Sequence, residues 1–236
     1  MSEKKITLEE VKKGNDVFYK ISNADQMAPF FMTIVSDSNH WMFISSNGGL
    51  SAGRKNSEFA LFPYYTDDKI TESTETTGSK TILRVHANGE QKVWEPFSVR
   101  SEMTFQCERN VYKSRYGNKI IFEEINHELG LSFQYEWNSS NQYGFVRKAT
   151  LTNLTSQEIH VSLIDGVQNV LPYGIGSDLQ NGTSNLADAY KRTELIPAAG
   201  VGIFALSAII VDKAEPSEAL KANTIWSAGL SNPVFL

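Results

Sequence analysis

Residues 41–70 concentrate the side chains that could do chemistry, because aromatic, amide, basic and acidic residues all fall within one short stretch. Aromatic rings stack on the apolar C–H faces of sugars, while amides, guanidinium groups and carboxylates hydrogen bond to sugar hydroxyls. This mixture predicts a carbohydrate site, although a packed pair of strands with a solvated rim would give the same composition. The candidate substrate-binding residues are Trp41, Asn47, Arg54, Tyr64, Tyr65, Asp67 and Asp68.

Each type in this set has an expected role. Trp41, Tyr64 and Tyr65 would stack on the sugar. Arg54, Asp67 and Asp68 would hydrogen bond to its hydroxyls. Asn47 stands directly before a Gly-Gly pair, so we expect it to shape a turn.

Other reactive residues give no catalytic or metal motif. The histidines form no HxH or HExxH pattern, which argues against a metal site; they are His40, His86, His127 and His160. Glu123 and Glu124 are neighbours on an expected strand, so they face opposite sides and cannot flank one glycosidic bond. We expect both to be solvated. Cys107 lies among apolar positions and is expected to be a small buried residue. The sequence therefore assigns no catalytic residue and no cofactor.

Composition excludes several classes of protein. The 236 residues are 41% hydrophobic and 21% charged, which is ordinary for a globular protein. The net charge of −5 argues against a nucleic-acid partner. The longest apolar run, residues 201–211, is too short to cross a membrane. One cysteine excludes an internal disulfide, and residues 1–5 are followed by no apolar run, so we expect a cytoplasmic protein.

The elements that must position these residues are mostly short strands separated by turn clusters. Strict alternation over residues 129–137 predicts a half-buried antiparallel strand, and Asn88-Gly89 predicts a tight hairpin between residues 81–87 and 92–94. Further strands are expected at residues 17–21, 29–35, 41–43, 101–112, 119–126 and 201–211, and residues 145–153 and 158–166 are expected to form a hairpin. Because no βαβ pattern occurs, the rhythm favours an all-β sandwich or barrel.

A few segments depart from this rhythm. Residues 7–10 match a helix capping box, which predicts a helical turn ending at Gly14. Residues 67–80 are expected to be an exposed loop, and residues 183–194 a short amphipathic helix. Pro216 would open a helical turn over residues 216–220.

Four motifs in a fixed order resemble a known family: Asn47-Gly48-Gly49, residues 62–68 (FPYYTDD), residues 145–148 (FVRK) leading into residues 151–153 (LTN), and residues 220–230 (LKANTIWSAGL). Together they resemble the N-terminal β-supersandwich of the cellobiose phosphorylase family, glycoside hydrolase family 94. The likeness spans nearly the whole chain and is carried by pattern and order. It implies one galactose-mutarotase-like domain over residues 1–236, an all-β, large antiparallel two-sheet supersandwich with a few short helices.

The resemblance also implies partners. In that family a helical linker and an (α/α)6 barrel follow the sandwich, and the barrel holds the general acid and the phosphate. No helix-pair repeats occur in these 236 residues, so no catalytic carboxylate is carried over. The resemblance implies a non-catalytic, carbohydrate-associated N-terminal domain of a longer enzyme, packed against the C-terminal (α/α)6 catalytic domain of the same chain and able to form a homodimer.

Two alternatives use the same fold differently. A stand-alone mutarotase or epimerase would need general acid and base groups, for which His86, or His127 beside Glu128, are the candidates. A pure protein-interaction sandwich would instead expose an apolar face to another subunit or domain.

Overall fold

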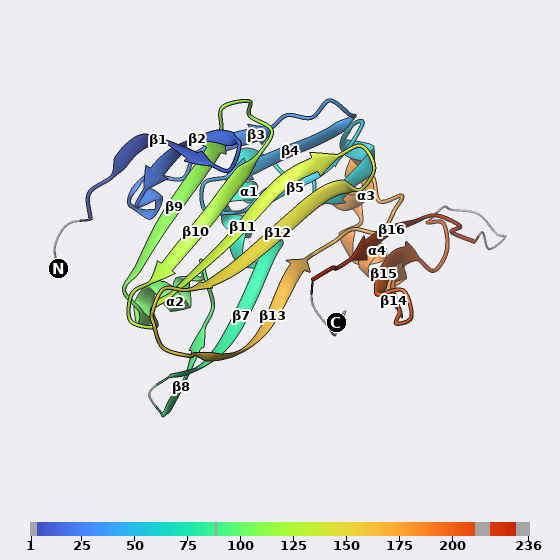
Figure 1. Cartoon of the computed structure of the whole chain (residues 1–236). Helices are drawn as coiled ribbons and strands as arrows, with labels where there is room; N and C mark the ends of the chain where they lie inside the picture. Colours follow the sequence, from blue (N-terminus) through green and yellow to red (C-terminus); the bar gives the residue numbers. More distant parts are fainter. Residues whose placement is uncertain (1–3, 88, 211–217, 230–236) are drawn as a thin grey trace. The chain divides into compact units, whose positions relative to one another are not determined.

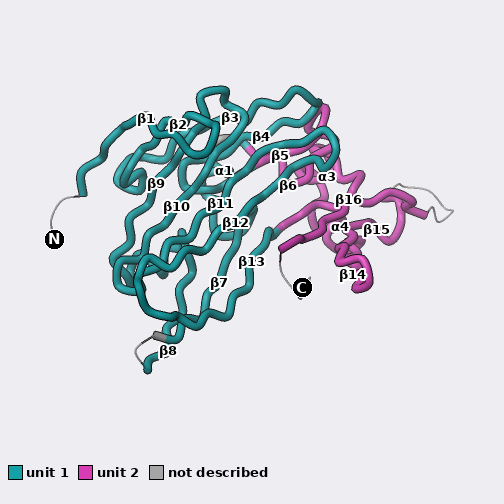
Figure 2. Tube along the Cα trace, in the orientation of Figure 1, with its two compact units in different colours: residues 1–50, 66–168 teal, residues 51–65, 169–236 magenta. Residues whose placement is uncertain are grey.

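The computed structural model describes residues 4–87, 89–210 and 218–229 (Figure 1). The chain divides into two compact units, which Figure 2 distinguishes by colour. Unit 1 comprises residues 1–50 and 66–168, and unit 2 comprises residues 51–65 and 169–236. The expectation that residues 1–236 form one domain stays a prediction.

Unit 1 contains a six-stranded antiparallel sheet with the strand order β1-β2-β9-β10-β11-β12. The strands β9 to β12 lie side by side in Figure 1. The bounds are β1 (Thr7–Lys13), β2 (Asp16–Ser22), β9 (Cys107–Ser114), β10 (Ile120–Asn126), β11 (Leu131–Ser140) and β12 (Gly144–Asn153).

A second sheet of unit 1 has the order β13-β7-β8, with β7 at Gly78–Ala87, β8 at Glu90–Trp94 and β13 at His160–Gln168. Side chains join it to the six-stranded sheet. Arg147 of β12 reaches Asp165 of β13, and Trp94 of β8 donates to Glu124 of β10. These contacts make unit 1 a two-layer antiparallel sandwich.

Smaller elements of unit 1 surround this sandwich. The strands β3 (Phe31–Ile34) and β4 (His40–Ser45) form an antiparallel pair. The helical segments are short: η1 (Ala24–Gln26), α1 (Asp67–Glu72), η3 (Ser73–Glu75) and α2 (Val99–Thr104).

The apolar core of unit 1 follows from the alternation seen in the sequence. In β11, every second side chain is 3% exposed or less, namely Leu131, Phe133, Tyr135 and Trp137. Phe122 of β10 stacks on Tyr135 with ring centroids 4.9 Å apart. Full burial of each such side chain contributes about 1.5–3 kcal/mol, so this face of the sheet dominates the stability of the unit.

Unit 2 is the smaller of the two units. The strand β5 (Leu50–Arg54) pairs with β6 (Ala60–Phe62), joined by η2 (Ser57–Phe59). A three-stranded sheet has the order β14-β15-β16, with bounds Lys191–Ile196, Val201–Leu206 and Ala222–Trp226. The helices α3 (Ser177–Gly182) and α4 (Ser184–Tyr190) contribute to a small core of Ile175, Ala187 and Leu206.

The predicted fold class is confirmed. All the strand pairs described are antiparallel, and the helices between them are short. The β11 strand and the hairpin between β7 and β8 also lie where the sequence placed them, with Ala87 paired to Glu90.

The expected helical turn near the N-terminus is wrong, because residues 7–13 form strand β1. A helix of so few residues has an unfavourable nucleus and little packing to offset it. Pairing with β2 instead gives a complete ladder from Thr7–Ser22 to Lys13–Asp16, closed by Gly14 at a φ of 60°.

Two other expectations fail because short helices form in both segments. Residues 67–80 are not an exposed loop, since they contain α1 and η3, with Ile70 2% exposed, before β7 begins. The expected long strand over residues 101–112 begins only at Cys107. Ser98 Oγ accepts the Ser101 N–H and caps α2, on which Met103 is 84% exposed.

The expected hairpin of residues 145–153 with 158–166 is also wrong. β12 pairs with β11, whereas β13 pairs with β7 in the other sheet. Residues 154–159 therefore cross between the two layers. Strand alternation predicts which side a residue faces but not which strand it joins.

The C-terminal part agrees in outline. The expected helix over residues 183–194 ends at Tyr190, where α4 gives way to β14. The strand expected over residues 201–211 forms as β15 but ends at Leu206. It is the central strand of its sheet and is only partly buried along its length. The turn expected over residues 216–220 lies largely outside the described residues.

Candidate functional site

The residues that the sequence grouped into one sugar site fall in both units. Trp41, Asn47, Asp67 and Asp68 belong to unit 1, and Arg54, Tyr64 and Tyr65 belong to unit 2. Proximity along the chain therefore does not place them in one compact unit.

Asn47 makes the contacts of a residue that shapes its turn. Its Nδ2 donates to the carbonyl oxygen of Thr71 at 3.0 Å, and its Oδ1 accepts the Gly49 N–H at 3.4 Å. A Cβ atom on Gly49 would lie 2.0 Å from the Ile70 carbonyl oxygen. The turn after β4 thus lies directly against α1, and the Asn47 amide is engaged there.

Asp68 is held by α1. Its Oδ1 accepts the Thr66 hydroxyl at 2.6 Å and the Lys69 N–H at 2.9 Å. The Thr66 hydrogen bond, followed by that from Lys69, lowers the pKa of Asp68, so the exposed carboxylate stays ionised. The backbone of Asp67 lies in α1, and its side chain is outside the described set.

Trp41 belongs to an outward-facing group that we call the aromatic strip, made of Phe31, Trp41 and Phe43. Met42 and Ile44 point inward from β4 and are 2% and 0% exposed. The intervening side chains must therefore face outward.

The strip is exposed to solvent, and its Trp41 and Phe43 rings are close together. Phe31 is 38% exposed, Phe43 is 40% exposed, and Trp41 is half-buried. The centroids of the Trp41 and Phe43 rings are 5.9 Å apart, with their planes tilted by 39°. The exposed Thr33 is the cross-strand partner of Phe43. The strip thus offers adjacent rings beside a hydroxyl group, which suits a sugar.

In unit 2, the three remaining candidates differ in exposure. Tyr64 is 41% exposed, and its N–H donates to Gln180 Oε1 at 2.9 Å. Arg54 is exposed at the end of β5, and Tyr65 is half-buried.

The paired glutamates of β10 are structural. They face opposite sides of the sheet, as predicted, but the expectation that both are solvated is wrong: Glu123 is 8% and Glu124 is 0% exposed. Each carboxylate accepts three hydrogen bonds from nitrogen or hydroxyl donors, which explains how burial is tolerated.

On the inner face, Glu124 accepts three hydrogen bonds. They come from Trp94 Nε1 at 2.8 Å, Phe97 N at 2.7 Å and Arg109 Nε at 2.7 Å. Burial alone would lower the pKa of Arg109, but its contacts with Glu124 raise the pKa above the ordinary value. Arg109 therefore stays charged and is firmly bonded to Glu124, which gives the buried carboxylate a structural role.

On the other face, Glu123 accepts from Asn110 Nδ2 at 2.9 Å, Gln134 Nε2 at 2.8 Å and the Tyr112 hydroxyl. Asn110 and Gln134 are its direct cross-strand partners on β9 and β11. Burial first, then the Glu123 contact, raises the pKa of Tyr112 far above its usual range. The sequence missed both networks because their partners become neighbours only through strand register and, for Trp94 and Phe97, through packing of separate elements.

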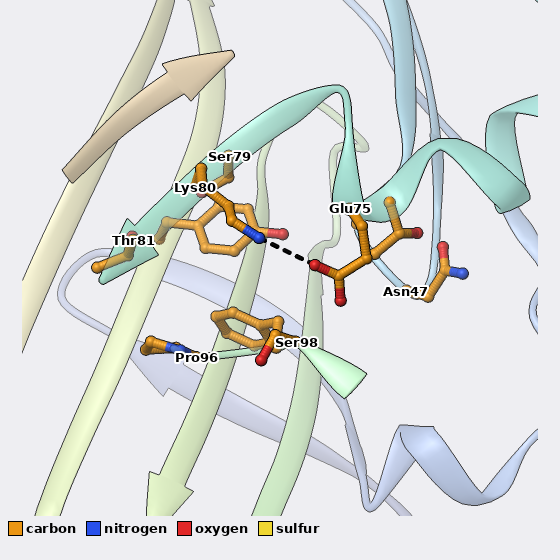
Figure 3. A pocket seen from close by; sticks show the side chains of 11 residues that line it. Asn47, Glu75, Ser79, Lys80, Thr81, Pro96 and Ser98 are labelled. Carbon is orange, nitrogen blue, oxygen red and sulfur yellow. Dashed lines mark hydrogen bonds and ion pairs between the residues drawn. The ribbon is translucent and has the colours of Figure 1, made fainter. Parts of the chain in front are cut away.

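A small cavity lies between the two layers of unit 1, and Figure 3 shows its polar lining. Lys80 Nζ lies 2.9 Å from Glu75 Oε2, the contact drawn as a dashed line, and also pairs with Glu95. The cavity volume is about 20 Å³. A volume of this size holds about one water molecule, whereas ligand pockets measure roughly 300–1,000 Å³. It is too small for a sugar.

A wider hollow of about 790 Å³ lies at the loop end of unit 1. It brings together His86, His127, His160 and Glu128, which are far apart in sequence. Glu128 Oε1 accepts the Gln106 N–H at 2.9 Å, and the described residues that line the hollow include no phenylalanine, tyrosine or tryptophan. Within the described residues, no three or more histidine, cysteine or acidic side chains are grouped to hold a metal ion.

The described part of the chain contains no helix with both the length and the apolar character needed to cross a membrane. Comparison with protein-family models gave no match, and neither did comparison with curated proteins. The choice of the aromatic strip as the candidate functional site therefore depends on its geometry alone.

Proposed function

We propose that this chain is a non-catalytic, carbohydrate-associated β-sandwich domain of a cellobiose-phosphorylase-like enzyme, and that the aromatic strip binds sugar. The observation that carries the proposal is the outward exposure of Phe31 and Phe43 beside Trp41 on β3 and β4. A soluble domain gains nothing in stability from rings left in water, whereas a sugar would cover their faces.

The state of the carboxylates supports a non-catalytic role. A glycosidase needs two carboxyl groups that flank one bond, one acting as general acid and the other as nucleophile or general base. Glu123 and Glu124 lie on opposite faces, and each is held by three intramolecular hydrogen bonds. The catalytic carboxylate would belong to the (α/α)6 domain that the resemblance implies.

An apolar patch on the outer face of the β13-β7-β8 sheet, centred four residues along each strand from His86 and His160, supports docking to that domain. Ile82, Val93 and Ile164 are 39%, 59% and 61% exposed, and Ile82 is the cross-strand partner of Ile164. A longer gene product containing the helical domain should protect the amides of β7 and β13 from hydrogen exchange relative to the 236-residue chain. A stop codon directly after Leu236, or unchanged exchange, would contradict this docking.

Isothermal titration tests the sugar site. Cello-oligosaccharides and monosaccharides at millimolar concentration should give heat with the wild type. Trp41→Ala should weaken binding at least about tenfold, equivalent to about 1.4 kcal/mol. Trp226→Ala is the matched control, since it removes a 46% exposed tryptophan from unit 2. Absence of heat with the wild type, or equal losses in the two variants, would contradict the sugar site.

The mutarotase alternative is favoured by one observation, that His86 and His127 line the same hollow. Polarimetry decides between the two functions. Anomerisation by the wild type that is lost in His86→Ala or His127→Ala would replace our proposal, whereas no catalysis by the wild type would support it.

We also propose a cytoplasmic location and, in the full enzyme, a homodimer. The one cysteine of the chain is buried and free, which suits a reducing compartment. Cell fractionation and ultracentrifugation of the longer gene product test these two points.

A further inference from the structure

The outer face of the β13-β7-β8 sheet carries two histidines in direct cross-strand register, His86 on β7 and His160 on β13. Both are exposed, and His86 alternates with Leu83 and Val85, which point inward and are 0% exposed. β7 and β13 run side by side in Figure 1. The two imidazoles thus project from the same side of neighbouring strands.

We propose that His86 and His160 form a two-histidine binding site for a divalent transition-metal ion. Directly opposed residues of antiparallel strands have Cβ atoms about 4.5–5.5 Å apart. Two imidazole rings at that spacing can both reach one ion at the usual metal–nitrogen distance of about 2.0–2.1 Å. Imidazole nitrogen is a preferred ligand for copper, nickel and zinc.

The surroundings favour a cation over an anion. Glu158 Oε1 lies 3.9 Å from His160 Nε2, and Glu90 and Glu128 line the same hollow. Arg84, two residues before His86 on β7, directs its Nη2 to Ser162 Oγ on β13 at 3.5 Å. The described residues hold no group of three or more metal-binding side chains, so water would complete the coordination sphere.

The pair could not be recognised from spacing in the sequence, since the two histidines are far apart along the chain. Their register depends on the crossing of residues 154–159 from one layer to the other, which brings β13 against β7. His127 lines the same hollow but belongs to the loop between β10 and β11, so it is not part of this cross-strand pair. That difference supplies the control.

Titration of untagged protein with Cu²⁺, Ni²⁺ and Zn²⁺ tests the site. We expect one ion per chain, with Cu²⁺ bound most tightly, as the usual order of divalent affinities requires. His86→Ala and His160→Ala should each weaken Ni²⁺ binding at least tenfold, while His127→Ala should change it less than twofold. In NMR spectra, Ni²⁺ should broaden amide signals of β7 and β13 around residues 86 and 160.

Three results would overturn the proposal. They are no binding by the wild type at 1 mM metal, affinity unchanged by both cross-strand variants, and an equal loss in His127→Ala. Because both side chains are exposed, the alanine variants should unfold at the wild-type temperature without metal, which separates loss of a ligand from loss of the fold.

Discussion

The Glu124 cluster, which is Glu124 with its donors Trp94, Phe97 and Arg109, is buried, whereas the aromatic strip is exposed. This is the opposite of what the polarity of the two groups would suggest. Glu124 is a charged side chain with 0% exposure, enclosed by Trp94 and Arg109. Phe43 is an apolar side chain with 40% exposure on the outer side of β4. The carboxylate that suggests chemistry stabilises the sandwich, and the ring that suggests a core is available to a ligand.

The first way to break this comparison is Glu124→Ala. Removing one partner of a buried ion pair leaves the other charge uncompensated and costs about 3–5 kcal/mol. Arg109 would keep its charge with a side chain only 16% exposed and would lose the closer of its ion pairs with Glu124 and Glu102. We expect urea unfolding to show a loss of this size.

Glu102→Ala is the matched control, because Glu102 pairs with the same Arg109 at 3.2 Å but its side chain is 55% exposed. A surface pair contributes about 0–1 kcal/mol. Similar small losses in both variants would mean that the Glu124 cluster does not stabilise the sandwich.

The second change is Gly49→Ala, in the turn that holds β4 against α1. The new methyl group would lie 2.0 Å from the backbone oxygen of Ile70, which no side-chain rotation relieves. We expect the free energy of unfolding to fall by about 1–3 kcal/mol, the usual cost of overpacking. Gly166→Ala, where a Cβ would meet nothing within 4 Å, should lower the free energy of unfolding much less. Thermal unfolding of both variants measures the difference.

The third change, Phe43→Ala, sharpens the contrast between stability and binding. Substitutions of surface residues usually alter stability by no more than about 0.5 kcal/mol, so this variant should unfold nearly as the wild type does. Its affinity for cello-oligosaccharide should nevertheless fall at least about tenfold.

Phe122→Ala provides the opposite case, since Phe122 is 2% exposed and its removal should cost about 3–5 kcal/mol. Calorimetric unfolding and sugar titration of both variants separate the two effects. A Phe43→Ala protein as unstable as Phe122→Ala would show that the strip is part of the core.

The smallest expected effect is the loss of stability at acid pH through protonation of Glu75. Burial alone would raise the pKa of Glu75, but hydrogen bonds from Lys80 and the Val99 N–H outweigh it and lower the pKa. A carboxyl group with a lowered folded pKa stabilises the protein above its unfolded pKa of about 4.3 and loses this contribution as the pH falls through the folded value. The effect is small because the Glu75 side chain is 39% exposed.

The difference in melting temperature between wild type and Glu75→Gln should therefore be present at pH 6 and shrink as the pH falls below about 4.3. A difference that stays constant down to pH 3 would show that ionisation of Glu75 does not stabilise the fold.

Much of the fold could be predicted because burial imposes a period of two on β11, and because Asn88-Gly89 permits few turns. Strand partners could not, since β12 and β13 alternate in the same way but join different sheets. Local alternation contains no information about which distant strand is the neighbour.

The candidate site was also predictable only in part. Trp41 was predicted as a stacking residue, and its ring lies on an outward face beside Phe43. Phe31 was missed because its place on the strip depends on the pairing of β3 with β4. The bonding of Glu124 was missed because Trp94, Phe97 and Arg109 converge on it from separate elements.

The most direct test uses the indole N–H signals of the four tryptophans. Trp94 and Trp137 are 0% and 3% exposed in the interior, whereas Trp41 is on the strip. Addition of cello-oligosaccharide to the labelled protein should shift the Trp41 indole signal and leave those of Trp94 and Trp137 in place. A shift of Trp94, whose N–H is bonded to Glu124, with Trp41 unchanged would contradict the division between structural carboxylates and the proposed sugar site on the aromatic strip.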